Sequence, residues 1–187
     1  MSKTAKSDVS PSDANDLAER VKKATPKGPP PVHLWNPPFS GDLDMQIKRD
    51  GSWFYEGTPI KRPELVRLFA SILKLEEGRY YLVTPVEKVG LTVEDAPFVA
   101  IDFDAEEDGL HFETNVGDRV VAGVDHPIRV EEDHQTGEPS PYIHIRRGLE
   151  ALIDRKSFYR LVEIGEVEGE SFVVRSAGKT FEIGPAV

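Results

Sequence analysis

Arg62-Pro-Glu-Leu-Val-Arg-Leu-Phe69 is matched later in the chain by Arg155-Lys-Ser-Phe-Tyr-Arg-Leu-Val162. Both place apolar side chains three and four residues apart, the spacing of one face of a helix, and both carry arginines at the same two positions. Each stretch is followed by a similar apolar run, Gly78-Arg-Tyr-Tyr-Leu-Val-Thr84 and Gly169-Glu-Ser-Phe-Val-Val-Arg175. The pattern predicts a helix followed by a hairpin, twice.

This likeness favours duplication of a small α+β unit, although shared binary patterning can produce a similar match. Lys88 and Lys179 also stand at the same offset from the two glycines. We therefore expect two related units, with a cleft between them as the default place for a ligand.

The residues before the first helix predict a β-hairpin. Asp50-Gly51 is a typical hairpin turn, and it separates the strand-like runs Met45–Arg49 and Trp53–Glu56. Pro63 suits the first turn of a helix. After that helix, strands are expected over 80–84 and 86–93.

The second half of the chain is richer in alternating patterns. Apolar and polar residues alternate from Val99 to Asp104, as in a half-buried antiparallel strand. A turn at Asp108-Gly109 would pair Phe103 with Thr114 and would place Asp104 opposite Glu113. Further strands are expected at 118–122, 128–131, 142–146, 171–175 and 180–183, a short helix at 149–153, and a helix from Arg155 capped by Asp154. The expected class is α+β, mostly antiparallel β with a few helices.

Residues 1–33 are rich in Ser, Lys, Ala, Asp and Pro, which predicts a flexible N-terminal arm. The alternative is a docked helix over 12–24, with Leu17, Ala18 and Val21 on its buried face. The expected organisation is an arm over 1–33, an α+β domain over 34–94 and a β-rich domain over 95–187.

Charge and composition exclude several classes of function. The 187-residue chain has a net charge of −10, and since residues 1–33 hold six basic and four acidic side chains, the remainder carries −12. So acidic a body disfavours general binding to nucleic acids or anionic membranes. The chain has no cysteine, which removes disulfides and thiolate chemistry, and no apolar stretch long enough for a membrane span. A cytoplasmic bacterial-type protein is expected.

Several motifs together resemble the bacterial domain-of-unknown-function family 1285, over about residues 35–184. They are Gly41-Asp-Leu-Asp-Met45, Asp50-Gly-Ser-Trp-Phe-Tyr-Glu-Gly57, Pro59-Ile-Lys-Arg-Pro63, Tyr80-Tyr-Leu-Val-Thr-Pro-Val-Glu-Lys88, Asp95-Ala-Pro-Phe98 and Thr114-Asn-Val-Gly-Asp118. The resemblance implies a two-part fold with repeated units, and a C-terminal part superficially like a pleckstrin-homology barrel. It also implies a ligand site between the parts and a signalling role with a nucleotide-like ligand, but no established activity.

Lys61 and Arg62 at the start of the first predicted helix are the first candidates for a ligand site. Two cations beside the free N–H groups of a helix start favour a bound phosphate or carboxylate, unless an acid of the same chain, such as Asp42 or Asp44, fills that role. Polar and aromatic residues elsewhere complete the candidate set for a small anionic, nucleotide-type ligand: Tyr55, Thr84, Asn115 and Tyr142.

Catalysis has a weaker basis in the sequence. Asp42, Asp44 and Glu87 could serve a metal-assisted hydrolase, but no nucleophile motif or phosphate loop accompanies them. The acidic hairpin residues Asp102, Asp104, Glu106 and Glu113, with His111, form either a solvated face or a cation site that departs from an EF-hand loop.

We therefore expect a regulatory protein that binds a small anionic ligand, rather than an enzyme. The alternatives are the hydrolase and a scaffold that binds another protein or a second copy of itself. The sequence specifies no cofactor and no metal.

Overall fold

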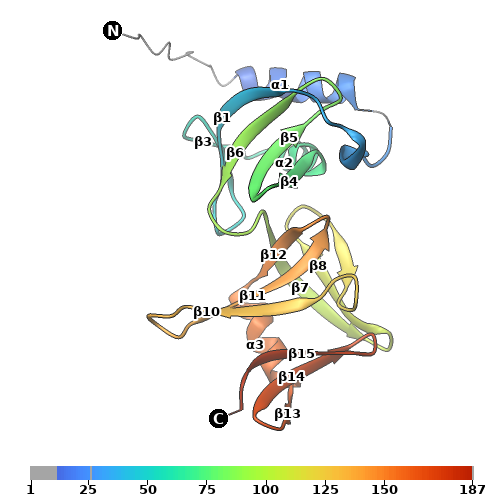
Figure 1. Ribbon diagram of the computed structural model, residues 1–187, viewed down its shortest axis with the longest axis vertical. Helices are drawn as coiled ribbons and strands as arrows, with labels where there is room; N and C mark the ends of the chain where they lie inside the picture. Colours follow the sequence, from blue (N-terminus) through green and yellow to red (C-terminus); the bar gives the residue numbers. More distant parts are fainter. Residues whose placement is uncertain (1–11, 26, 187) are drawn as a thin grey trace. The chain divides into compact units, whose positions relative to one another are not determined.

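The computed structural model describes residues 12–25 and 27–186, which divide into two compact units (Figure 1). Unit 1 comprises the described residues up to Gln46 together with Ser52–Thr92. Unit 2 comprises Ile47–Gly51, at the turn of the first hairpin, and the described residues from Val93 onward.

Unit 1 is a six-stranded sheet with helices against it. The strand order is β3-β2-β1-β6-β5-β4. The strands are β1 (Phe39–Ile47), β2 (Trp53–Tyr55), β3 (Thr58–Pro59), β4 (Leu73–Glu76), β5 (Arg79–Val83) and β6 (Lys88–Val93). The helices are α1 (Ser12–Ala24) and α2 (Pro63–Ser71), with a 3-10 turn, η1, at Val32–Leu34. Trp53 stacks on Phe69 in the core, which fixes α2 on the sheet.

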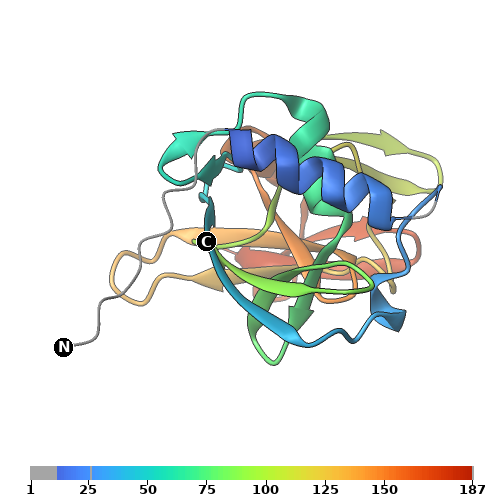
Figure 2. The same cartoon turned by 90° about the horizontal axis from the view of Figure 1, so that it is seen from above.

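The segment at 12–24 forms the helix of the alternative interpretation. Leu17, Ala18 and Val21 of α1 are buried, and α1 packs against α2. Figure 2 shows α1 along its full length. Residues 12–24 are therefore a docked helix rather than part of a flexible arm. The local sequence could not predict this, because the short apolar face of α1 is buried by residues far away in the sequence. Residues 1–11 of the predicted arm lie outside the described residues.

Unit 2 contains a six-stranded sheet in the order β10-β11-β12-β7-β8-β9 and a three-stranded sheet, β13-β14-β15. The first sheet has β7 (Phe98–Glu106), β8 (Gly109–Thr114), β9 (Arg119–Val121), β10 (Ile128–Glu132), β11 (Pro139–Arg146) and β12 (Leu149–Ile153). Helix α3 (Arg155–Ile164) precedes β13 (Glu166–Glu168), β14 (Ser171–Ser176) and β15 (Lys179–Pro185). The cap of α3 is the predicted one: Asp154 accepts a hydrogen bond from the Ser157 N–H at 2.8 Å.

The expected helix at 149–153 is wrong, because this segment is strand β12. Leu149, Ala151 and Ile153 are buried while the residues between them are half-buried, which is the period of a strand. β12 pairs antiparallel with β11 and parallel with β7, so two neighbours decide its conformation.

The register expected for the β7–β8 hairpin is wrong by two residues. Its turn is at Glu107-Asp108, so Phe103 faces Phe112 and Asp104 faces His111. A shift of two residues keeps the apolar side chains on one face, and the burial pattern is therefore unchanged. Gly109 is instead the first residue of β8, where a Cβ atom would lie 2.7 Å from the Ser176 hydroxyl.

Each unit contains a helix that is followed by antiparallel strands, as expected for an α+β protein. α2 is followed by the antiparallel strands β4, β5 and β6, and α3 by β13, β14 and β15. Lys88 and Lys179 are each the first residue of the third strand. The strands before each helix differ, with three in unit 1 and six in unit 2, so the likeness is limited to this helix and meander.

Candidate functional site

A cavity of about 490 Å³ lies beside the start of α2 in unit 1, and we call it the α2 pocket. It is lined from α1, from the β2–β3 hairpin and from the segment that leads into α2. The lining residues are Ala14, Asn15, Tyr55, Glu56, Thr58, Pro59, Ile60, Lys61, Arg62 and Leu65. Three of the six predicted ligand residues, Tyr55, Lys61 and Arg62, are thus brought together.

Arg62 is held at the edge of this pocket by two hydrogen bonds. Its Nη1 donates to Asn15 Oδ1 at 2.8 Å, and its Nε donates to Glu64 Oε1 at 3.0 Å. Lys61 is exposed and has no polar partner among the described residues. The pocket therefore carries one fixed guanidinium and one ammonium that is available to a ligand.

A residue of the first turn of α2, Glu64, provides the negative charge at the start of this helix. Arg62 is the N-cap residue without a side-chain cap, and Pro63 has no N–H to satisfy. The backbone N–H of Glu64 and the Arg62 side chain hold the pKa of the Glu64 carboxyl below its ordinary value. Glu64, rather than Asp42 or Asp44, is therefore the acid of this chain that occupies the helix start.

Thr84 lies apart from the α2 pocket. It is buried in the turn between β5 and β6, where its hydroxyl accepts hydrogen bonds from the N–H groups of Val86 and Glu87. This is the bonding of a turn residue, and Thr84 does not line any of the pockets described here.

Asn115 and Tyr142 belong to unit 2, and both make structural hydrogen bonds there. Asn115 Oδ1 accepts from the Val99 N–H at 3.0 Å, and its Nδ2 donates to the Gly51 carbonyl at 3.2 Å. The Tyr142 hydroxyl donates to Asp95 at 2.7 Å.

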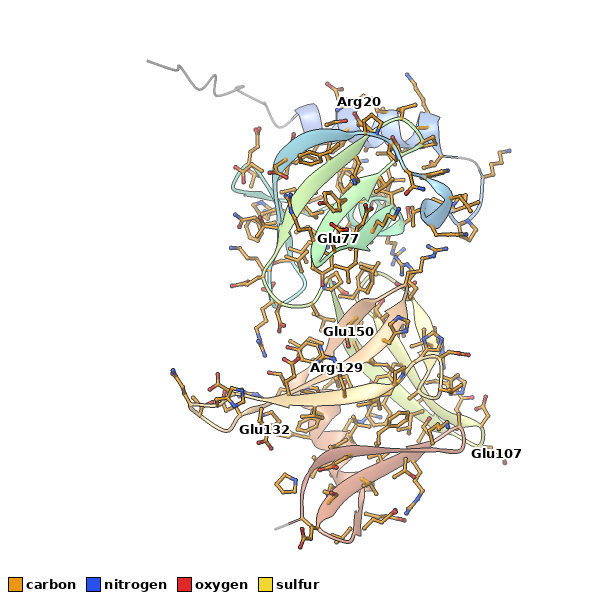
Figure 3. The ribbon with its side chains drawn as sticks, in the orientation of Figure 1. Arg20, Glu77, Glu107, Arg129, Glu132 and Glu150 are labelled. Carbon is orange, nitrogen blue, oxygen red and sulfur yellow. The ribbon has the colours of Figure 1, made fainter. Side chains whose placement is uncertain are left out.

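The Tyr142 ring is covered by a guanidinium. Arg129 lies 4.5 Å from the ring centroid and pairs with Glu150, and Figure 3 labels both members of that pair. The hydrogen bonds with Glu150 raise the pKa of Arg129, so this cation stays charged beside the ring.

The three carboxylates of the hydrolase hypothesis are engaged separately or exposed. Asp42 and Asp44 lie on the exposed face of β1, and Asp42 pairs with Arg79 at 2.8 Å. Glu87 lies 3.8 Å from Arg20. In the described part of the chain they do not form a group that could hold a metal ion.

The acidic β7–β8 hairpin contains one such group, Glu106, Asp108 and His111, with ligand atoms within 4.8 Å of one another. His111 Nε2 lies 2.7 Å from Asp108, and this contact lowers the pKa of the Asp108 carboxyl. Arg119 lies within 3.3 Å of Asp104 and Glu106. Arg119 therefore already neutralises part of the charge that a metal ion would meet.

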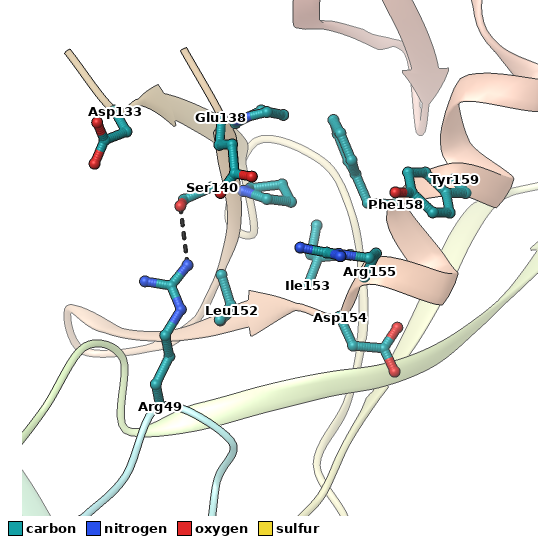
Figure 4. Close-up of a pocket in the computed structure, with 12 residues that line it drawn as sticks. Arg49, Asp133, Glu138, Ser140, Leu152, Ile153, Asp154, Arg155, Phe158 and Tyr159 are labelled. Atoms are coloured by element: carbon teal, nitrogen blue, oxygen red, sulfur yellow. Dashed lines mark hydrogen bonds between the residues drawn. The ribbon is translucent and has the colours of Figure 1, made fainter. Parts of the chain in front are cut away.

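A second polar pocket, of about 490 Å³, lies in unit 2 beside the start of α3, and sequence reasoning missed it (Figure 4). Its lining includes Arg49, Ser140, Asp154, Arg155 and Tyr159. The sequence does contain the clue, because Arg155 corresponds to Arg62 in the two matched stretches. The strands that complete the pocket come from elsewhere in the chain and were not predictable from that match.

The fold is thus that of a two-unit α+β protein with a helix and meander in each unit, and with pockets at the start of each of these helices. Family models assign the same two parts: residues 30–96 match "Domain of unknown function (DUF1285), N-terminal domain" and residues 97–183 match "Protein of unknown function (DUF1285), C-terminal domain". The chain belongs to the DUF1285 family.

Two solved structures are similar to this chain. A DUF1285 family protein from Silicibacter pomeroyi DSS-3 is 59% identical, with a TM-score of 0.84, over 90% of this chain and 94% of that one. A DUF1285 family protein from Shewanella baltica OS155 is 31% identical, with a TM-score of 0.53, over 65% of this chain and 91% of that one. No curated protein matches the sequence significantly. Among the described residues, none of the helices has the length and apolar character needed to cross a membrane.

Proposed function

We propose that the protein is a ligand-binding regulatory protein, and that its α2 pocket binds a small anion with an apolar or aromatic part. A nucleotide is one member of this class. A cytoplasmic location belongs to the same proposal.

The observation that carries the proposal is the position of two cations at the edge of an apolar cavity. Lys61 has no polar partner in the described chain, and Arg62 is fixed by Asn15 and Glu64. The walls beside them are Tyr55, Pro59, Ile60 and Leu65. Pockets that combine apolar walls with a few convergent polar groups are typical ligand sites.

The chemistry of the pocket also limits the ligand. Lys61 can contact a phosphate or carboxylate as a point charge, and Arg62 can do so once Glu64 turns away from it. Since Glu64 competes for Arg62, a dianionic phosphate should bind better than a monoanionic carboxylate. The Tyr55 side chain offers an aromatic surface beside the charges.

A thermal-shift titration with AMP, ADP and phenyl phosphate tests this proposal, because a ligand that binds only the folded state raises the melting temperature. We expect a shift with at least one of these phosphates and a loss of that shift in the variant with Lys61→Ala and Arg62→Ala. Arg67→Ala is the matched control, since Arg67 is exposed on the same helix and does not line the pocket. A flat response to all three, or equal shifts in the double variant, would overturn the proposal.

A further inference from the structure

Unit 2 contains two neighbouring cavities beside α3 that the proposed function does not use. The polar pocket at the start of α3 and an apolar cavity of about 480 Å³ share two wall residues, Pro139 and Phe158. The two cavities are therefore neighbours, with Pro139 and Phe158 forming part of the wall of each, and together we call them the α3 groove.

One end of the α3 groove is almost entirely apolar. Its lining includes Phe158, Val162, Val167, Phe172, Ile183 and Pro185, with Glu132 as the ionisable side chain. Val162 and Val167 are 40% and 65% exposed. Burying such side chains under a ligand is favourable, because it removes apolar surface from water.

The other end presents an arginine that is available to a ligand. Figure 4 shows the Arg155 side chain extending from the start of α3 into the pocket, on the opposite side from Arg49. Arg155 is exposed and has no polar partner among the described residues, whereas Arg49 pairs with Asp95 and donates to the Ser140 hydroxyl at 3.0 Å. The free guanidinium fork and the hydroxyl of Ser140 are suited to phosphate or carboxylate oxygens.

Three acidic residues, Asp133, Glu138 and Asp154, line the polar end, and two of them already accept hydrogen bonds from backbone N–H groups. Asp154 caps α3, and Asp133 accepts hydrogen bonds from the N–H groups of Gln135 and Thr136. Glu138 is exposed, and its carboxylate has no partner among the described residues, so it favours a head group with a hydroxyl or ammonium next to its anionic group.

We infer that the α3 groove binds a single-chain amphiphile from solution, with its anionic head at Arg155 and its hydrocarbon tail between α3 and the β13–β15 sheet. The composition of the walls favours a hydrocarbon over a peptide. A peptide would bring N–H and C=O groups into the apolar end, where the lining side chains offer few partners, whereas a methylene chain needs none.

Calorimetric titration of the full chain with dodecyl phosphate, below its micelle-forming concentration, tests this inference. We expect saturable binding at the α3 groove. Arg155→Ala should weaken it about tenfold, as expected from the loss of charge-assisted hydrogen bonds to the head, and Val162→Asp should weaken it at least tenfold by placing a charge against the tail. Lys179→Ala is the matched control for charge, because Lys179 is exposed and lines neither cavity.

Competing ligands separate the alternatives. Inorganic phosphate or dodecanol alone should bind at least tenfold more weakly than dodecyl phosphate. Equal binding of either would overturn the amphiphile in favour of a simple anion or an apolar ligand. Adsorption to anionic phosphatidylglycerol vesicles without binding of the monomer would indicate a membrane surface, and self-association abolished by Val162→Asp would indicate a second copy; each result would overturn the inference.

The two proposals fail separately. The variant with Lys61→Ala and Arg62→Ala should bind dodecyl phosphate as the parent does. Loss of binding in that variant, with Arg155→Ala unaffected, would assign the amphiphile to the α2 pocket and overturn the α3 groove. Melting temperatures of all variants, measured without ligand, show whether each one folds.

Discussion

Tyr142 donates the hydrogen of its hydroxyl to Oδ1 of Asp95 over 2.7 Å, from a position that is 95% buried in unit 2. Arg49 forms an ion pair with the other carboxylate oxygen of Asp95, Oδ2, at a distance of 2.8 Å from its Nη1. This contact does not have the alignment of a hydrogen bond. The turn residue Arg49, the strand residue Tyr142 and Asp95 between them are therefore coupled. Burial, together with the hydrogen bond to Asp95, raises the pKa of Tyr142 to about 12.

Alkaline pH should consequently destabilise unit 2 through Tyr142. Its pKa is higher in the folded than in the unfolded chain, so its contribution is complete below about pH 10 and is lost as the pH rises toward 12. Tyr142→Phe should cost about 1 kcal/mol of unfolding free energy at pH 7 and remove this part of the alkaline loss. Urea unfolding of parent and variant between pH 7 and 11.5 measures both; parallel pH profiles would contradict the assignment.

Asn115 should contribute to stability through its two hydrogen bonds to backbone groups. Asn115→Ala leaves the Val99 N–H and the Gly51 carbonyl without their partner, which should cost about 1 to 3 kcal/mol. Asn36→Ala, at an exposed position, serves as the control and should cost less than half as much in the same chemical denaturation. Equal effects of the two substitutions would show that the Asn115 bonds add little.

Ser176 joins two elements of unit 2 by buried hydrogen bonds. Its hydroxyl donates to the Ala122 carbonyl at 2.7 Å and accepts from the Leu110 N–H at 2.8 Å. Ser176→Ala should lower the free energy of unfolding by about 2 to 4 kcal/mol, because both backbone groups stay buried without partners. Ser71→Ala removes a hydroxyl that bonds only within its own helix, and it should have a much smaller effect on the melting temperature.

Leu17 should be part of the core of unit 1 although it lies in the N-terminal segment. Its side chain is 3% exposed, so Leu17→Ala should cost about 2 to 3 kcal/mol by leaving a cavity beneath α1. Lys22→Ala on the exposed face of α1 is the control. If urea midpoints of the two variants coincide, α1 does not pack on unit 1 in solution.

Local patterns predicted the elements whose conformation depends on their own residues. Pro63 and the spacing of Leu65 and Phe69 specify α2, and Asp154 specifies the start of α3. The segment at 149–153 is different, because its alternating burial exists only once β11 and β7 lie on either side of it. The β7–β8 hairpin has a different register from the predicted one. Gly109 lies in β8 close to Ser176, where a side chain would not fit, and not in the turn.

The candidate site was predictable only where its residues are consecutive in the chain. Lys61 and Arg62 could be identified from their place before α2, and Tyr55 lies on the preceding hairpin. The partner of Arg62 on α1, Asn15, gives no signal of its own, since its role depends on how α1 docks. The α3 groove was not predicted for the same reason. Arg155 could be identified from the sequence match, but the walls of the groove come from β11, β12 and the last sheet.

Strand β13 lies at the edge of the three-stranded sheet, and among the described residues no other strand pairs with its outer side. An open edge of this kind invites intermolecular β-pairing, and charged side chains on the edge discourage it. Glu166 and Glu168 flank Val167 and both pair with Arg175. Replacing both glutamates by glutamine would remove the negative charge from this edge, so the edge should become a template for aggregation, and fibril growth should begin at this strand.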